Sequence, residues 1–187
     1  MERKRGIVLG NEKFLALVKS CFPMDYVLCS NLLEAKTKLR TQKFDYLIIL
    51  YAQSQNEVLH FAKDCAVVKN ISTLMVCKQE IFDQVQYQIR ESGVLLLAYP
   101  VKKQSIYQAL CILDNIREKL LQYERKYQKL EQRYLELKFV DRCKLMLISN
   151  YKWSEEKAHH YIEKLAMDNG SSKYTIAKKL LEELETS

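Results

Sequence analysis

The sequence predicts an α/β domain with a five-stranded parallel sheet, followed by a long helix and a small helical domain. The first hundred residues alternate short apolar runs with stretches of helical periodicity, as a doubly wound sheet does. After Pro100, neither glycine nor proline occurs before Gly170. Because these two residues end most helices, their absence allows one very long helix there.

Each strand of the sheet is predicted from an apolar run. The third run, Asp45 to Tyr51, is apolar without interruption after Asp45, which indicates a strand buried on both faces of a parallel sheet. Ser30 or Asn31 is expected to cap the second helix. The strands are predicted at residues 6–9, 26–29, 45–51, 73–77 and 94–98, and the helices between them at residues 12–22, 32–39, 58–68 and 80–90.

The long helix carries a narrow apolar stripe with an unbroken 3-4 spacing, and polar residues lie between its positions. This pattern is typical of a coiled-coil seam and predicts a homodimer. The alternative is a single amphipathic helix packed on its own domain, which such a narrow stripe fits less well. The stripe consists of Leu113, Ile116, Leu120, Tyr123, Tyr127, Leu130, Tyr134 and Leu137, and the dimer contacts are predicted at Ile116, Leu120, Tyr127, Leu130, Tyr134 and Leu137.

The last fifty residues are expected to form a compact three-helix unit. The long helix should break at residues 150–153, and Ser154 is a good N-cap for the next helix. That helix should stop at Asn169-Gly170, and the third should start at Ser171 or Ser172. Small residues at Ala158, Ala166 and Ala177 allow close packing, and Trp153 and Tyr161 are expected in the core. The predicted domains are 1–110, 111–137 and 138–187.

Composition narrows the classes of function. The net charge of +7 suits an acidic partner such as nucleic acid, although a lysine-rich surface alone would also produce it. The six cysteines form no C-x-x-C pair, and the basic N-terminus leads into no long apolar run, so a cytoplasmic protein without a membrane span is expected. No Gly-rich phosphate loop, Gly-x-Ser-x-Gly or His-Glu-x-x-His motif occurs, so we expect no enzyme, cofactor or metal.

The first hundred residues resemble the CheY-like (flavodoxin-like) receiver domain of response regulators in the order and spacing of strands and helices. In that family an acidic pair after the first strand and an aspartate ending the third bind magnesium and take a phosphoryl group. A threonine after the fourth strand and a lysine after the fifth complete the switch. Here these positions hold Gly10 and Asn11, then Leu50, Cys77 and Tyr99. Leucine cannot form an acyl phosphate, so the resemblance implies a degenerate receiver.

Residues 137–184 resemble an ANTAR domain, the RNA-binding module of certain antitermination regulators. The matching segments are Cys143-Lys144-Leu145-Met146-Leu147, Ser154-Glu155-Glu156-Lys157-Ala158, Leu165-Ala166-Met167 and Ile176-Ala177. Cys143 and Leu145 replace small residues of the family pattern. The order of receiver, coiled coil and three-helix tail is also that of the family.

The resemblance implies an antitermination regulator that binds hairpin RNA in nascent transcripts as a dimer. The degenerate receiver implies an input other than phosphorylation, such as a protein or a small ligand; a redox input at Cys77 is disfavoured by its apolar setting. The predicted RNA-binding residues are Arg142, Lys144, Lys173, Tyr174, Lys178 and Lys179, with Tyr151 and Trp153 as further stacking candidates. For the lysines, a solvated face is the alternative. For the chain, the alternatives are a DNA-binding regulator and a protein-interaction module docking on a sensor.

Overall fold

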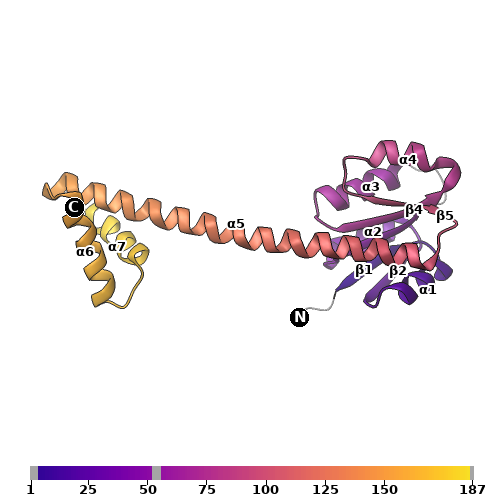
Figure 1. Ribbon diagram of the computed structural model, residues 1–187, viewed down its shortest axis with the longest axis horizontal. Coiled ribbons are helices and arrows are strands. Elements are labelled where there is room, and N and C mark those ends of the chain that lie inside the picture. The colour runs from indigo at the N-terminus through magenta and orange to yellow at the C-terminus, as the bar shows by residue number, and fades with distance from the viewer. Residues whose placement is uncertain (1–3, 52–55, 186–187) are drawn as a thin grey trace. The chain divides into compact units, whose positions relative to one another are not determined.

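The computed structural model describes residues 4–51 and 56–185 and divides the chain into two compact units, residues 1–120 and 121–187. The first unit contains a parallel sheet flanked by helices (Figure 1). Its five strands have the order β2-β1-β3-β4-β5. This order is that of doubly wound flavodoxin-like folds. The strands are β1 (Arg5–Leu9), β2 (Asp25–Cys29), β3 (Tyr46–Tyr51), β4 (Ser72–Lys78) and β5 (Leu95–Tyr99), one at each predicted run.

Helices cover both faces of this sheet. Helices α1 (Glu12–Cys21) and the start of α5 (Lys103–Tyr151) pack on one face, where Val18 and Leu110 meet Ile48 and Leu74. Helices α2 (Leu32–Thr41), α3 (Asn56–Val67) and α4 (Phe82–Ile89) pack on the other, against Ile49 and Met75. Successive side chains of β3 therefore pack in the cores on opposite faces of the sheet, as its apolar sequence predicts.

The helices α2 and α4 begin in different ways. Asn31, and not Ser30, caps α2, because its side-chain oxygen accepts a hydrogen bond of 2.9 Å from the backbone N–H of Glu34. The helix predicted at 80–90 is shorter. It opens with the 3-10 turn η1 (Gln79–Ile81), and no side chain caps the start of α4.

An ion-pair cluster fixes the start of α5 to the sheet. Asp114 accepts a hydrogen bond of 2.5 Å from Lys4 Nζ and another from the Tyr46 hydroxyl. One turn later, Arg117 pairs with Asp45 at the start of β3. Burial alone raises the pKa of Asp114, but the hydrogen bonds from Lys4 and Tyr46 outweigh burial and hold this pKa below its usual value.

The residues of the apolar stripe of α5 change from buried to exposed just after Asp114. Leu113, predicted as its first seam residue, is instead buried in the core of the first unit. From Ile116 onward the side chains emerge, because the sheet no longer covers them. The residues that are 46–68% exposed in the single chain are Ile116, Leu120, Tyr123, Tyr127, Leu130, Tyr134 and Leu137. The stripe is therefore not packed on the chain's own domains.

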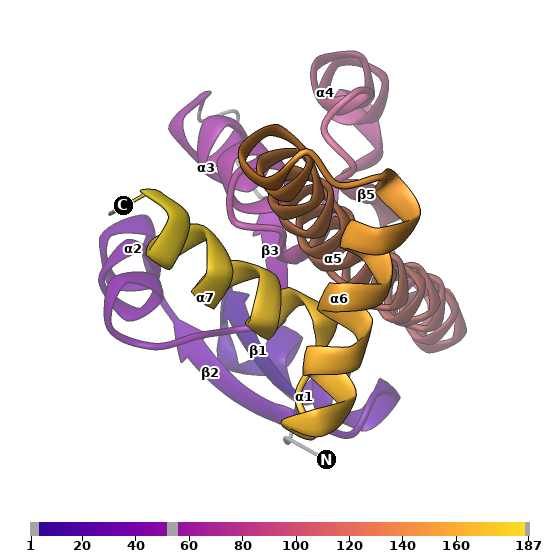
Figure 2. The same cartoon turned by 90° about the vertical axis from the view of Figure 1, so that its left-hand side faces the viewer.

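The second unit consists of the end of α5 with α6 (Glu155–Asp168) and α7 (Lys173–Glu185) (Figure 2). Gly170, with φ +56°, ends the turn between α6 and α7, in the conformation that glycine adopts without strain. None of the described helices combines the length and the apolar character that a membrane span needs.

We predict that Asp114→Asn lowers the free energy of unfolding of the first unit by about 1–2 kcal/mol at pH 7, because Lys4 and Tyr46 lose a charged acceptor. Since the folded-state pKa of Asp114 lies below its unfolded value, the contribution is present above the unfolded pKa and is lost as pH falls through the folded one. Urea unfolding of the variant and the unaltered chain measures the difference in their free energies of unfolding, first at pH 7 and then at a pH below the folded-state pKa of Asp114. Asp64→Asn, at an exposed carboxylate, is the control; equal effects of both variants would refute the role of Asp114.

Candidate nucleic-acid interface

The second unit is held by one small core, to which all three helices contribute. Ala158 and Ala177 are fully buried and Ala166 nearly so, which confirms the predicted close packing. Cys143, in place of a small residue, is also fully buried, and burial raises the pKa of its thiol to about 11. The core consists of Cys143, Leu147, Ala158, Ile162, Ala166, Ile176, Ala177 and Leu181.

The start of α6 is set by its cap. Ser154 accepts a hydrogen bond of 3.2 Å from the backbone N–H of Lys157, and Glu155 and Glu156 occupy the first turn. Lys152, the first residue after α5, has φ +55°, and the chain turns there between α5 and α6. This turn fixes Trp153 beside the first turns of α6.

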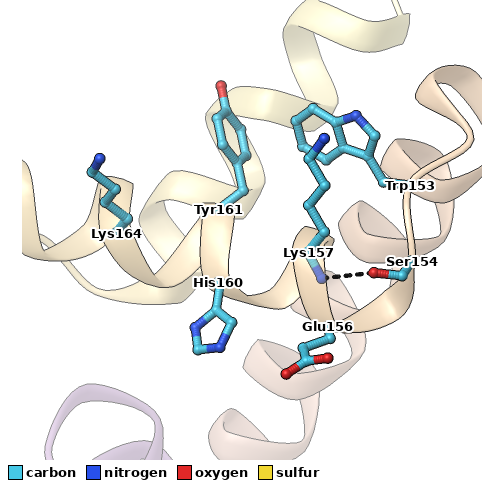
Figure 3. A pocket seen from close by; sticks show the side chains of 7 residues that line it. All are labelled: Trp153, Ser154, Glu156, Lys157, His160, Tyr161 and Lys164. Atoms are coloured by element: carbon cyan, nitrogen blue, oxygen red, sulfur yellow. Dashed lines mark hydrogen bonds between the residues drawn. The ribbon is translucent and has the colours of Figure 1, made fainter.

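Aromatic rings gather on the outer face of α6. A hollow of about 450 Å³ is lined by Trp153, Ser154, Glu156, Lys157, His160, Tyr161 and Lys164 (Figure 3). The Tyr161 ring meets the Trp153 ring edge-on with 5.1 Å between centroids, and the centroid of the Tyr151 ring lies 5.3 Å from that of Trp153. Exposed aromatic faces of this kind are where unstacked RNA bases can stack.

Two lysines flank these rings. Lys157 Nζ lies 4.7 Å from the centroid of the Trp153 ring, a cation–π contact, and Lys164 points to the same side as Tyr161 (Figure 3). Glu156 and His160 point the other way (Figure 3). Within the described residues neither Lys157 nor Lys164 has a carboxylate within ion-pair distance. Both lysines are exposed, so their charge is available to phosphates.

The residues of this face were not all predicted correctly from the sequence. Trp153 does pack against the core, as expected, but the placement of Tyr161 in the core is wrong, since its side chain is 37% exposed. Lys157 and Lys164 were not among the predicted binding residues. The spacing of positions 153, 157, 161 and 164 along one helical face was the signal that could have identified them.

The predicted residues Lys144, Lys173 and Tyr174 lie around a second hollow, of about 410 Å³, between α5 and α7. Both lysines are engaged within the unit. Lys144 Nζ lies 2.8 Å from Asp141 and 3.3 Å from Glu155, and hydrogen bonds to these carboxylates raise the pKa of Lys144. Lys173 Nζ lies 2.6 Å from Glu163. Tyr174 is half-buried, with its ring edge-on to Phe139.

The remaining predicted residues are exposed on the surface of the second unit. Lys178 and Lys179 lie on α7 and have no carboxylate within ion-pair distance among the described residues. Arg142 lies on α5 and is also exposed. Lys178 and Lys179 are thus exposed without an ion-pair partner among the described residues, whereas Lys144 and Lys173 form ion pairs within the unit.

In the first unit, the residues that the receiver resemblance assigns to the phosphorylation positions come together at the carboxyl ends of the strands. Asn11, Leu50, Cys77 and Tyr99 line one pocket, and Gly10 lies beside Leu50. Asn11 accepts a hydrogen bond of 2.9 Å from the backbone N–H of Phe14 and so caps α1. Cys77 is fully buried, and burial raises the pKa of its thiol. The described lining contains no carboxylate, and no cluster of three metal-ligating side chains occurs in residues 4–51 and 56–185.

Comparison with known proteins finds a family match for the second unit and a shared fold for the first. Residues 128–181 match the ANTAR domain family. No curated protein matches the sequence. The matched segment covers the end of α5, all of α6 and most of α7, the helices that form the core of the second unit.

Solved receiver domains share the fold of the first unit. A response regulator from Thermotoga maritima is 14% identical over 59% of this chain and 97% of its own, with a TM-score of 0.52. The signal receiver domain of an HD domain-containing protein from Pseudomonas fluorescens Pf-5 is 13% identical over 64% of this chain and 99% of its own, also at 0.52. The N-terminal receiver domain of a response regulator from Bacteroides fragilis is 15% identical over 60% of this chain and 97% of its own, at 0.50. The first unit therefore has the receiver fold.

We predict that the chain takes no phosphoryl group at the receiver position, because Leu50 offers no nucleophilic oxygen. After incubation with acetyl phosphate and magnesium, intact-mass measurement should show the unmodified chain alone. Leu50→Asp in the same assay tests whether the acceptor alone is missing, and it should also remain unmodified because Gly10 and Asn11 supply no acidic pair for the metal. A stoichiometric adduct of about 80 Da on the unaltered chain would refute the prediction.

Proposed function

From an ANTAR domain joined to a receiver fold, we propose that this chain is a transcription antitermination regulator that binds hairpin RNA of nascent transcripts as a dimer. Its receiver would be controlled by something other than aspartyl phosphorylation. The observation that carries the RNA-binding part is the outer face of α6, defined by Trp153, Lys157, Tyr161 and Lys164. In this arrangement, aromatic faces and exposed lysine charges stand side by side.

The chemistry of this face suits RNA loops better than a duplex. Bases of a hairpin loop are unstacked and can lie on the Tyr161 ring, while Lys157 and Lys164 meet the flanking phosphates. A DNA duplex keeps its bases stacked and offers them only through its grooves, so aromatic faces gain little from it.

The DNA-binding alternative would use α7 as a recognition helix. In that geometry the first residues of the helix contact base edges. Here Lys173 at the start of α7 is paired with Glu163, and Glu182 and Glu183 lie near the end of the helix. Positive charge is therefore confined to Lys178 and Lys179, a poor match to the phosphates along a groove.

The exposed stripe of α5 supports the dimer. Side chains such as Leu130, Tyr134 and Leu137 are each about two-thirds exposed in the single chain. A second copy of the same helix would cover them in a coiled coil with a 3-4 spacing. Two ANTAR domains in one dimer would bind two adjacent hairpins with a gain from effective concentration.

Loss of the lysines of the α6 face should weaken RNA binding. We expect Lys157→Ala/Lys164→Ala to reduce affinity for a tandem-hairpin RNA about tenfold or more and to lower the salt dependence by about two counterions. Fluorescence anisotropy at several salt concentrations measures both. Lys19→Ala/Lys36→Ala removes the same charge from exposed positions of the first unit and serves as the control.

The same titration with duplex DNA of equal length discriminates the alternatives. The unaltered chain should bind the RNA more tightly at matched salt. Tighter binding of DNA would favour the DNA-binding regulator, and binding of neither would favour the protein-interaction module. An unchanged affinity in the Lys157/Lys164 variant would show that RNA uses another face.

The dimer is tested by placing charge in the stripe. Leu120→Glu/Leu130→Glu would bury two carboxylates in the predicted seam, at a cost of several kcal/mol, and should yield a monomer by light scattering. Gln122→Glu/Gln128→Glu adds the same charge outside the stripe and should leave a dimer. The interpretation is wrong if the unaltered chain is monomeric at concentrations on the order of tens of micromolar.

A further inference from the structure

The pocket at the degenerate phosphorylation positions has the size of a small-ligand site. Its volume is about 330 Å³, and it is lined by Asn11, Lys13, Phe14, Leu17, Leu50, Tyr51, Cys77, Lys78 and Tyr99. These residues come from the start of α1 and the ends of β3, β4 and β5, so a rigid framework holds the walls in place. Ligand pockets of proteins measure about 300–1,000 Å³, which places this one among sites for small molecules.

The walls of the pocket are mostly apolar. Phe14 and Cys77 are buried, and Leu17 and Leu50 are half-buried, so their exposed parts face the pocket. The Asn11 side-chain oxygen is already occupied by the cap of α1. An apolar surface of this kind favours a ligand with a hydrocarbon body and does not replace the hydration shell of a small inorganic ion.

The charge at the pocket is positive. Lys13 and Lys78 are exposed and belong to different elements of the lining, α1 and the end of β4. Neither has a carboxylate within ion-pair distance among the described residues, and the described lining holds no acidic side chain. Two lysines beside an apolar wall that holds no acidic side chain among its described residues suit an anionic head on an apolar body.

The place of the pocket in the sheet supports a binding role. In open parallel sheets, ligands bind outside the carboxyl ends of the strands, where the strand order reverses. Here β1 lies between β2 and β3, so the reversal falls between β1 and β3. Asn11 and Lys13 follow β1, and Leu50 and Tyr51 end β3.

From these observations we infer that this pocket binds a small organic carboxylate with an aromatic or aliphatic body. The carboxylate meets Lys13 and Lys78, and the body packs on Phe14, Leu17 and Leu50. Tyr99 lines the same pocket four residues before α5 begins, so the ligand touches the segment that leads into the helix of the apolar stripe.

The test is a binding titration with the full chain, by calorimetry and by ligand-observed NMR. The probes are benzoate and hexanoate, with neutral benzamide and inorganic phosphate for comparison. Because no RNA is present, the outcome does not depend on the proposed function. We expect at least one carboxylate to bind saturably at one per chain, and benzamide and phosphate to bind about tenfold more weakly or not at all.

Variants locate the site. Lys13→Ala/Lys78→Ala should weaken carboxylate binding about tenfold, while Lys19→Ala/Lys36→Ala, exposed lysines outside the pocket, should not. Leu50→Trp should fill the pocket and abolish binding. If circular dichroism shows that this variant does not fold, the comparison of Lys13→Ala/Lys78→Ala with Lys19→Ala/Lys36→Ala tests the inference. The inference is overturned if neither carboxylate binds at about 10 mM, if benzamide or phosphate binds as well, or if both lysine pairs behave alike.

Discussion

Helix α5 is the constraint on which the rest of the structure depends. Its first turns complete the core of the receiver fold through Ile106 and Leu110, and its last turns supply Cys143 and Leu147 to the ANTAR core. Between these two segments, the residues of the apolar stripe from Ile116 to Leu137 are exposed in the single chain. Helices in water owe most of their stability to packing of an apolar face, so this stretch is the physical reason to expect a second copy. The cluster of Lys4, Tyr46 and Asp114 sets where the covered part of the helix ends.

The residues at the carboxyl ends of the strands give this edge of the receiver fold a chemistry different from that of a phosphorylation site. A phosphoacceptor site needs clustered carboxylates to hold a divalent cation. Here Leu50 and buried Cys77 make the edge apolar, and Asn11 is used to cap α1. Lys13 and Lys78 then leave positive charge with no acid beside it among the described lining residues. An input that reaches this edge would meet Tyr99 just before α5, the helix that both units share.

Periodicity in the sequence was sufficient to predict the fold. Uninterrupted apolar runs located the strands, and the 3-4 spacing without glycine or proline located α5, because burial on a regular element leaves a regular pattern. The interface was harder to predict. Lys144 and Lys173 were chosen as phosphate contacts, but each has carboxylate partners that lie 3 to 11 residues away on the chain, and sequence does not show which lysines pair. Tyr161 shares the helical spacing of the core residues and yet lies at the edge of the core face, where a small rotation decides exposure. Whether Ile116 to Leu137 contact a second copy remains a prediction of the same periodicity.

The central claim is that the chain acts on transcripts, and sequencing of the nucleic acid that it binds in its own cells tests this most directly. The chain would be crosslinked, purified and treated separately to recover RNA and DNA. The account predicts enriched RNA leader segments that contain adjacent hairpins overlapping a terminator, with loss of that enrichment in the Lys157→Ala/Lys164→Ala variant. Enrichment of genomic DNA sites without RNA, or RNA recovery that the variant leaves unchanged, would contradict it.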